Sequence, residues 1–188
     1  MSTAAAAPQT PTTSTWNIDP VHSVVEFKVK HMMISNVKGH FSSVTGTLSL
    51  DEGRPENSSV QASIEVASIS TRDAQRDGHL KSADFFDAEK FPTIDFKSTS
   101  VKPTAKASGT VEGDLTIHGV TRKVVLDVDG PTAPGKDPWG NTRVGVTAGT
   151  RISRKDFGLT WNAALETGGV LVGDEVTITL DVQFVKTA

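Results

Sequence analysis

The stretch that decides the fold is SVVEFKVKHM, residues 23–32, in which apolar and charged residues alternate. Val25, Phe27 and Val29 carry apolar side chains, and a glutamate and a lysine lie between them. Successive side chains of a β-strand point to opposite faces, so this spacing separates the apolar groups from the charges. It predicts a strand with one buried face and one solvated face.

The same alternation recurs along most of the chain. It is present in residues 59–66, 94–97, 111–117, 123–129, 144–152 and 176–184. Trp16 and Ile18 indicate a short opening strand, and the total comes to about eight or nine strands. In residues 37–50, Phe41 and Val44 differ in parity, and a bulge near Ser42 and Ser43 would reconcile them.

Three segments interrupt this rhythm. Residues 71–90 lack the alternation, and they predict one or two short helices that end before Pro92. Residues 155–169 are rich in Asn and Gly, and we expect a long, partly helical connection that covers an opening. Residues 131–141 predict a Pro/Gly-rich loop between two strands.

Strands with a single apolar face pack as a sandwich or close into a barrel. A closed barrel has no unpaired strand edges, and eight strands enclose an interior that side chains fill or that holds one small ligand. Periodicity alone does not separate the two architectures. We favour an all-β fold: one antiparallel barrel of about eight strands with a short helical insertion.

Composition sets limits on domains and on location. The 188 residues suit one domain, which we place at residues 16–188, after a disordered Ala/Thr/Pro-rich segment at residues 1–15. No apolar run reaches transmembrane length, so we expect no stable membrane insertion. The N-terminus lacks the pattern of a signal peptide, and a cytoplasmic location is the resulting expectation.

Composition and motifs also narrow the chemistry. The net charge of −3 without a basic run argues against a nucleic-acid partner, and the absence of cysteine excludes disulfides and thiolate ligands. The five histidines lack zinc-site spacing, and no nucleophile elbow or phosphate-binding loop is present. We therefore expect no metal, no cofactor and no enzymatic activity. His22 beside Asp19 is typical of a hydrogen-bonded turn.

Four segments, in this order, resemble the YceI family. They are DPVHSVVEFKVKHMMISNVKGHF (19–41), HLKSADFFDAEKFP (79–92), GDLTIHGVTRKV (113–124) and FGLTWNAALETGGVLVGDEVTI (157–178). The resemblance implies a lipocalin-like barrel with a long apolar tunnel that carries a polyisoprenoid or a similar long lipid. It further implies that no catalysis is established, and that homodimers are common.

Candidate ligand-binding residues follow from the inward faces of the strands and from the aromatic side chains of the two irregular segments. They are Val25, Phe27, Val29, His31, Phe41, Ile64, Val66, Phe85, Phe86, Phe91, Ile94, Phe96, Leu115, Ile117, Leu126, Val146, Trp161, Ile178, Leu180 and Phe184. For each of them, plain core packing is an alternative to ligand contact.

The predicted function is storage or transport of a long apolar lipid in the barrel, such as a polyisoprenoid, an isoprenoid quinone precursor or a fatty-acid derivative. Two alternatives stay open. The protein could be an enzyme acting on a lipid or quinone precursor, with His31 or His79 in acid–base chemistry. It could also be a stress-response interaction protein whose barrel is filled by its own side chains.

Overall fold

The computed structural model describes residues 13–187, and most of these residues lie in β-strands. The strands are Thr13–Ile18 (β1), Val24–His31 (β2), Ser35–Phe41 (β3), Val44–Asp51 (β4), Ser59–Glu65 (β5), Ile69–Ser70 (β6), Thr93–Ala105 (β7), Ser108–Ile117 (β8), Val120–Asp129 (β9), Gly135–Lys136 (β10), Thr142–Ser153 (β11) and Val172–Lys186 (β12). The helical segments are Pro20–His22 (η1), Pro55–Asn57 (η2), Val66–Ser68 (η3), Ala74–Lys81 (α1) and Arg154–Phe157 (η4).

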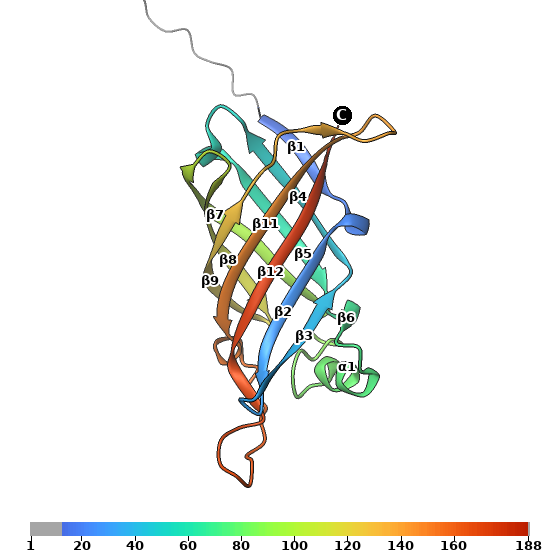
Figure 1. Cartoon of the computed structure of the whole chain (residues 1–188), viewed down its shortest axis with the longest axis vertical. Helices are drawn as coiled ribbons and strands as arrows, with labels where there is room; N and C mark the ends of the chain where they lie inside the picture. Colours follow the sequence, from blue (N-terminus) through green and yellow to red (C-terminus); the bar gives the residue numbers. More distant parts are fainter. Residues whose placement is uncertain (1–12, 188) are drawn as a thin grey trace, which may run out of the picture.

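These strands form one closed antiparallel barrel (Figure 1). It has eight strand positions, which we call walls because two of them each consist of two short strands in line. β1 and β2 together make the first wall, and β3 and β4 make the second, because β1 pairs with β4 while β2 pairs with β3. The remaining walls are β5, β7, β8, β9, β11 and β12, each paired with the next. β12 closes the barrel because its other edge pairs with both β1 and β2. The predicted barrel is confirmed.

The change of parity after Phe41 has a different origin from the bulge that we expected. β3 ends at Phe41 and β4 begins at Val44, so the strand is interrupted at residues 42–43. The neighbouring wall breaks as well, at η1, where Asp19 accepts a hydrogen bond from the amide of Val21. Both walls therefore bend, and side chains from either side of the break face the interior.

The barrel has two unlike ends (Figure 1). At the lower end lie α1, the β2–β3 turn at residues 32–34 and the connection from η4 to β12; at the upper end lie η2, the β7–β8 turn and β10. The insertion at residues 71–90 contains a single α-helix, begun by the Asp73 side chain, which accepts from the amide of Arg76. The connection at residues 155–169 is helical only in η4, and the rest of it is irregular.

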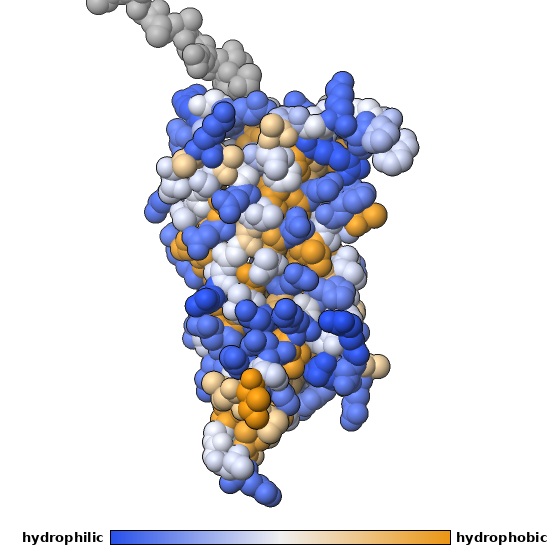
Figure 2. All heavy atoms as spheres, in the orientation of Figure 1, coloured by the Kyte–Doolittle hydropathy of each residue, from blue (hydrophilic) through white to orange (hydrophobic). Residues whose placement is uncertain are grey.

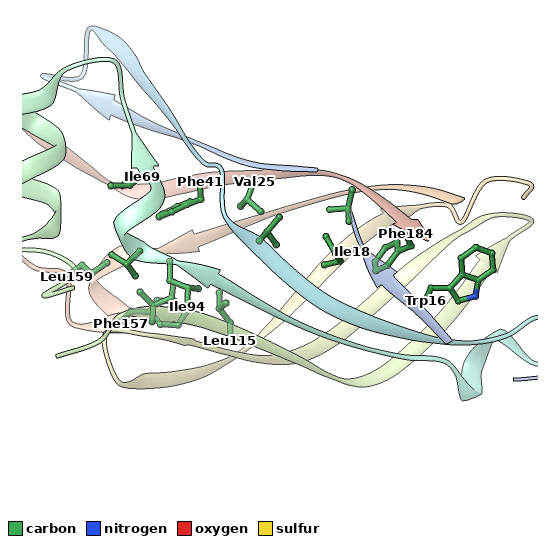
Figure 3. Packing of buried hydrophobic residues seen from close by; sticks show 14 of the residues in the cluster. Trp16, Ile18, Val25, Phe41, Ile69, Ile94, Leu115, Phe157, Leu159 and Phe184 are labelled. Carbon is green, nitrogen blue, oxygen red and sulfur yellow. The ribbon is translucent and has the colours of Figure 1, made fainter. Parts of the chain in front are cut away.

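The core is a set of apolar side chains that follow the inside of the barrel along its length (Figure 3). Trp16, Phe157, Val44 and Val66 are its most completely buried members. Trp16 lies on β1, which begins at Thr13 and therefore includes the last three residues of the segment expected to be disordered. The rest of that segment lies outside the described residues.

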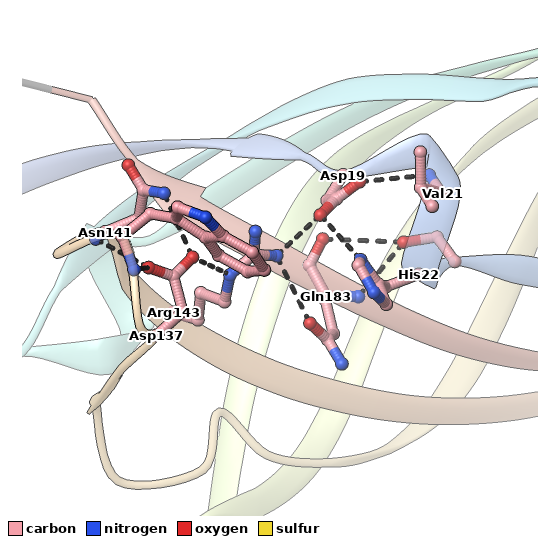
Figure 4. A network of polar contacts seen from close by, with 9 residues as sticks. Asp19, Val21, His22, Asp137, Asn141, Arg143 and Gln183 are labelled. Atoms are coloured by element: carbon pink, nitrogen blue, oxygen red, sulfur yellow. Dashed lines mark hydrogen bonds and ion pairs between the residues drawn. The ribbon is translucent and has the colours of Figure 1, made fainter.

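An ionic network ties the upper end together (Figure 4). The Arg143 guanidinium on β11 donates to Asp137 Oδ2 at 2.7 Å and to Asp19 Oδ2 at 2.5 Å. His22 Nδ1 lies 2.9 Å from the same Asp19 oxygen, as expected for a hydrogen-bonded turn. Asn141 donates its side-chain amide to Asp137. The network thus fixes the β10 connection to the strand break at η1.

A second polar cluster centres on Arg154, whose side chain is only 5% exposed. Its guanidinium donates to the carbonyl oxygens of Gly173 at 2.8 Å, Leu159 at 2.6 Å and Trp161 at 2.9 Å. These carbonyls belong to the irregular connection and to the start of β12. Arg154 therefore supplies the hydrogen bonds that this non-repetitive backbone cannot make with itself.

Exposed apolar side chains gather at the tip of the lower end (Figure 2). Met33 and Ile34 are 61% and 78% exposed, and Val170 beside them is 39% exposed. The amide of Met32 donates to the carbonyl of Leu171 at 2.7 Å, which joins the β2–β3 turn to the loop before β12. Within residues 13–187, no helix has the length and apolar character needed to cross a membrane.

Candidate functional site

An internal cavity of ≈ 690 Å³ lies inside the barrel, and apolar side chains form most of its wall. The alternation of the strands explains the wall directly, because every second residue of a strand faces inward. On β12, for example, Val176, Ile178, Leu180, Val182 and Phe184 all line the cavity. The inward-facing side chains of the strands therefore form the candidate binding site.

Most of the candidate residues lie on this wall. They are Val25, Phe27, Val29, Phe41, Ile64, Phe85, Phe86, Ile94, Phe96, Leu115, Ile117, Leu126, Val146, Ile178, Leu180 and Phe184. Their contact with a ligand stays a prediction, since the structure holds none. Other inward residues of the same alternation, such as Ile18, Val60 and Val111, also line the cavity and were not among the candidates.

Four of the candidate residues do not line the cavity. His31 has the inward parity and stands at the end of β2, opposite Ser35, but it does not line the cavity. Val66 is buried in η3, where the alternation of β5 has ended, and its amide donates to the carbonyl of Pro92. Phe91 packs edge-on against His118 at 4.9 Å between ring centroids, outside the cavity.

Trp161, the fourth of these candidates, does not line the cavity but packs behind a residue that does. Its ring lies 4.7 Å from that of His79 and 5.3 Å from that of Phe85. Phe85 in turn lines the cavity, and Phe86 packs edge-on against Phe41 at 6.0 Å. The helical insertion with its aromatic residues thus closes the lower end of the cavity.

At the upper end the wall is made by exposed residues, so the cavity reaches solvent there. Glu52, Pro55, Lys106 and Pro134 all contribute to the wall, and all are exposed. They come from three connections that share no periodic pattern. The sequence therefore gave no signal for this mouth, since alternation marks only strand residues.

Apolar groups make up nearly all of the cavity interior. Every buried side-chain nitrogen or oxygen atom among the described residues has a hydrogen-bond partner. Arg154 lines the lower part of the cavity, but its donors are used by backbone carbonyls. Burial lowers the pKa of Arg154, as desolvation disfavours the charged form. Among residues 13–187, no three His, Cys, Asp or Glu side chains group as metal ligands.

The dimensions of the cavity suit a single extended chain. Lining residues of β12 run from Val172 to Phe184. At about 3.3 Å per residue and a strand tilt of about 40°, this run extends about 30 Å along the barrel axis. A volume of ≈ 690 Å³ spread over that length makes the cavity long and narrow, as one extended hydrocarbon chain requires.

A closed eight-walled antiparallel barrel around a narrow apolar cavity defines a lipocalin-like protein. A model of the YceI-like domain matches residues 16–184. A UPF0312 protein of Pseudomonas fluorescens is 43% identical over 142 residues, which cover 73% of this chain and 71% of the relative. A UPF0312 protein of Vibrio cholerae is 41% identical, over 73% of this chain and 72% of its own. The chain belongs to the YceI-like family.

Solved structures share the fold. The crystal structure of the Campylobacter jejuni YceI protein has a TM-score of 0.71 and 29% identity, covering 86% of this chain and 91% of that one. A polyisoprenoid binding domain from Saccharophagus degradans has a TM-score of 0.64 and 16% identity, covering 92% and 98% of the two chains. The latter likeness concerns the fold alone.

Proposed function

We propose that this protein binds a long apolar lipid in its barrel, as a store or a carrier. The observation that carries the proposal is the continuous apolar cavity of ≈ 690 Å³. Each buried methylene group contributes about 0.8 kcal/mol, so an apolar wall suffices to hold a long chain. The polyisoprenoid binding domain of Saccharophagus degradans, which shares the fold, supports the same class of ligand.

The length of the cavity favours a polyisoprenoid or an isoprenoid quinone precursor over a membrane fatty acid. The hydrocarbon core of a bilayer is about 30 Å thick, so a chain in one leaflet spans about half of that. The cavity accepts a chain about twice as long. The polar end of such a ligand would lie at an opening of the cavity, because the interior is apolar.

A carrier accounts for the interior better than either alternative. An enzyme would need a polar group aimed at the substrate, and His31 and His79 do not line the cavity. A barrel filled by its own side chains would leave no cavity of this size. Homodimer formation and a cytoplasmic location stay predictions.

Organic extraction of freshly purified protein, followed by mass spectrometry, tests the proposal. We expect about one lipid per chain, with an extended hydrocarbon part. Delipidated protein should take up a polyprenol from solution to the same ratio. Failure of both the extraction and the reloading to give a bound lipid would overturn the proposal.

A further inference from the structure

The wall between β9 and β11 is incompletely paired. The two strands pair only between Asp127–Asp129 and Thr147–Gly149. On their other edges, β9 pairs with β8 from Val120 through Asp129, and β11 pairs with β12 from Arg143 through Ser153. The lower halves of β9 and β11 therefore separate, although each is well held by its other neighbour.

A groove of ≈ 320 Å³ occupies this separation, and we call it the lateral groove. Its lining residues are Arg122, Lys123, Val124, Val125, Thr150, Arg151, Ile152, Ser153, Asp156 and Phe157. Val124, Thr150 and Ile152 also line the internal cavity. These three side chains therefore lie between the groove and the interior, beside the buried ring of Phe157.

The energetic cost of a passage is lower here than between two fully paired strands. A chain that passed between two fully paired strands would have to break ladder hydrogen bonds, each worth about 1 kcal/mol. Between β9 and β11, below Gly149, those pairs are not formed among the described residues. A passage here would require side-chain movements of Val124, Thr150 and Ile152, and of Phe157 beside them, without the loss of ladder hydrogen bonds.

The surface of the lateral groove fits a ligand with an apolar chain and a polar end. Val125 is 48% exposed on an outer strand face that is otherwise mostly polar. Lys123 lies 3.7 Å from Asp114, and Arg151 lies 3.9 Å from Glu175, so these cations have carboxylate partners. The guanidinium of Arg122 and the hydroxyl groups of Thr150 and Ser153 supply hydrogen-bond donors within the groove.

We propose that the lateral groove is a side entrance, through which the apolar chain of the ligand enters the cavity while its polar end stays in the groove. This inference rests on the proposed lipid-binding function. A peptide strand added to the exposed edges is the other occupant that such edges admit. The three lining residues shared with the cavity favour the lipid chain, because a peptide strand would not need that connection.

A cross-link across the lateral groove tests the entrance, and the absence of native cysteine makes it specific. Continuing the register beyond Gly149 sets Val125 opposite Arg151, with both side chains on the outer face. We would bridge the double variant Val125→Cys/Arg151→Cys with a reductant-cleavable bis-maleimide. The matched control is Asp129→Cys/Thr147→Cys, an outward pair in the part of the ladder that is already formed.

The readout is the rate at which each protein takes up cis-parinaric acid, an apolar polyene with a carboxylate end, followed by its fluorescence. We expect the bridge across the groove to slow uptake at least tenfold, and reductant to restore it. The bridge in the control should leave the rate unchanged. Release of preloaded probe into phosphatidylcholine vesicles should slow in the same way, and circular dichroism checks the fold.

Equal rates with and without the groove bridge would overturn the side entrance and leave the lipid-binding proposal intact. If no unbridged protein took up this probe or the polyprenol used for reloading, the result would instead count against lipid binding itself.

Discussion

Arg154 shows how a single residue can order a segment that has no regular structure. Its side chain reaches three carbonyl oxygens, those of Gly173, Leu159 and Trp161, within 2.9 Å. A planar guanidinium can serve several acceptors at once, whereas an ammonium group at the end of a flexible stem cannot reproduce that geometry. Arg154 thereby holds the connection that lies beneath the cavity.

Replacement of Arg154 by Met keeps much of the side-chain volume and removes every donor. We expect the free energy of unfolding to fall by about 3 kcal/mol, because buried acceptors left unpaired cost about 1–3 kcal/mol each. Arg154→Lys should recover only part of the loss. Urea unfolding measures both, and Arg151→Met is the control, since Arg151 is 71% exposed and its ion pair is long. Equal losses in Arg154→Met and Arg151→Met would contradict the assignment.

The ionic network at Arg143 predicts a dependence of stability on pH. Hydrogen bonds from Arg143 and His22 lower the pKa of Asp19 to about 2, and those from Arg143 and Asn141 lower the pKa of Asp137. Carboxyl groups with a lowered pKa stabilise the fold above their unfolded-state pKa of about 4. This stabilisation is lost as the pH falls from about 4 towards 2.

Arg143→Met should therefore unfold more easily than the native protein at pH 6, and the difference should shrink as the pH falls below about 4. Denaturant unfolding at a series of pH values measures this. Arg151→Met again serves as control, because both members of its ion pair are exposed. A difference that stays constant down to pH 2 would show that the network does not act through these carboxylates.

At the scale of the element, two glycines of the barrel strands are each covered by a phenylalanine ring. A Cβ atom at Gly113 would lie 2.4 Å from Cζ of Phe96 and 2.6 Å from the backbone oxygen of Lys97. The Phe96 ring therefore occupies the space that a side chain at Gly113 would need. Phe27 covers Gly39 in the same way, with Cζ 2.4 Å from the added Cβ position.

Gly113→Ala should accordingly lower the free energy of unfolding by about 2 kcal/mol, the range of overpacked cores, because the backbone oxygen of Lys97 cannot move away independently. Gly149→Ala is the control, since its Cβ would lie 3.6 Å from the nearest atom, the carbonyl oxygen of Ile178. Thermal unfolding compares the two. An equal effect at both positions would mean that strand propensity, and not the Phe96 contact, decides the outcome.

The elements also show why part of the architecture was predictable from sequence. Alternation placed Val25, Phe27 and Val29 inward because a strand within a barrel wall has one apolar face. His31 shares the inward parity but does not line the cavity, since parity does not reveal where the cavity ends, and its contact with a ligand stays a prediction. The same rule misread the step from Phe41 to Val44, because a bulge and a break between strands change parity alike.

Pairing between strands was beyond the reach of periodicity. The apolar residues Val124 and Ile152 alternate in their strands just as paired residues do, yet their strands separate at the lateral groove. The mouth was missed for a related reason, because Pro55, Lys106 and Pro134 lie in connections. Alternation therefore specifies what faces the interior, while the openings of the cavity depend on contacts between segments distant in sequence.

At the scale of the whole molecule, the cavity should allow a substitution to abolish ligand binding without lowering stability. In a protein with a filled core, a substitution of an interior residue usually lowers stability as well, because removing buried atoms destabilises a fold. Here the interior has unfilled space, so adding atoms to it should not strain the barrel. A small residue that faces this space, such as Ala148 on β11, is the place to add them.

Ala148→Phe would set an aromatic ring into this long, narrow cavity. We expect the melting temperature to stay equal or to rise, since buried apolar area increases, while the ratio of extracted lipid to protein falls well below that of the native protein. The control is Thr147→Phe, which adds the same ring to the outer face of the same strand and should keep its lipid. Mass spectrometry of the extract and a thermal melt measure the two quantities. A native lipid ratio in Ala148→Phe would mean that the lipid is held elsewhere than in the barrel, because a chain cannot share so narrow a space with the added ring.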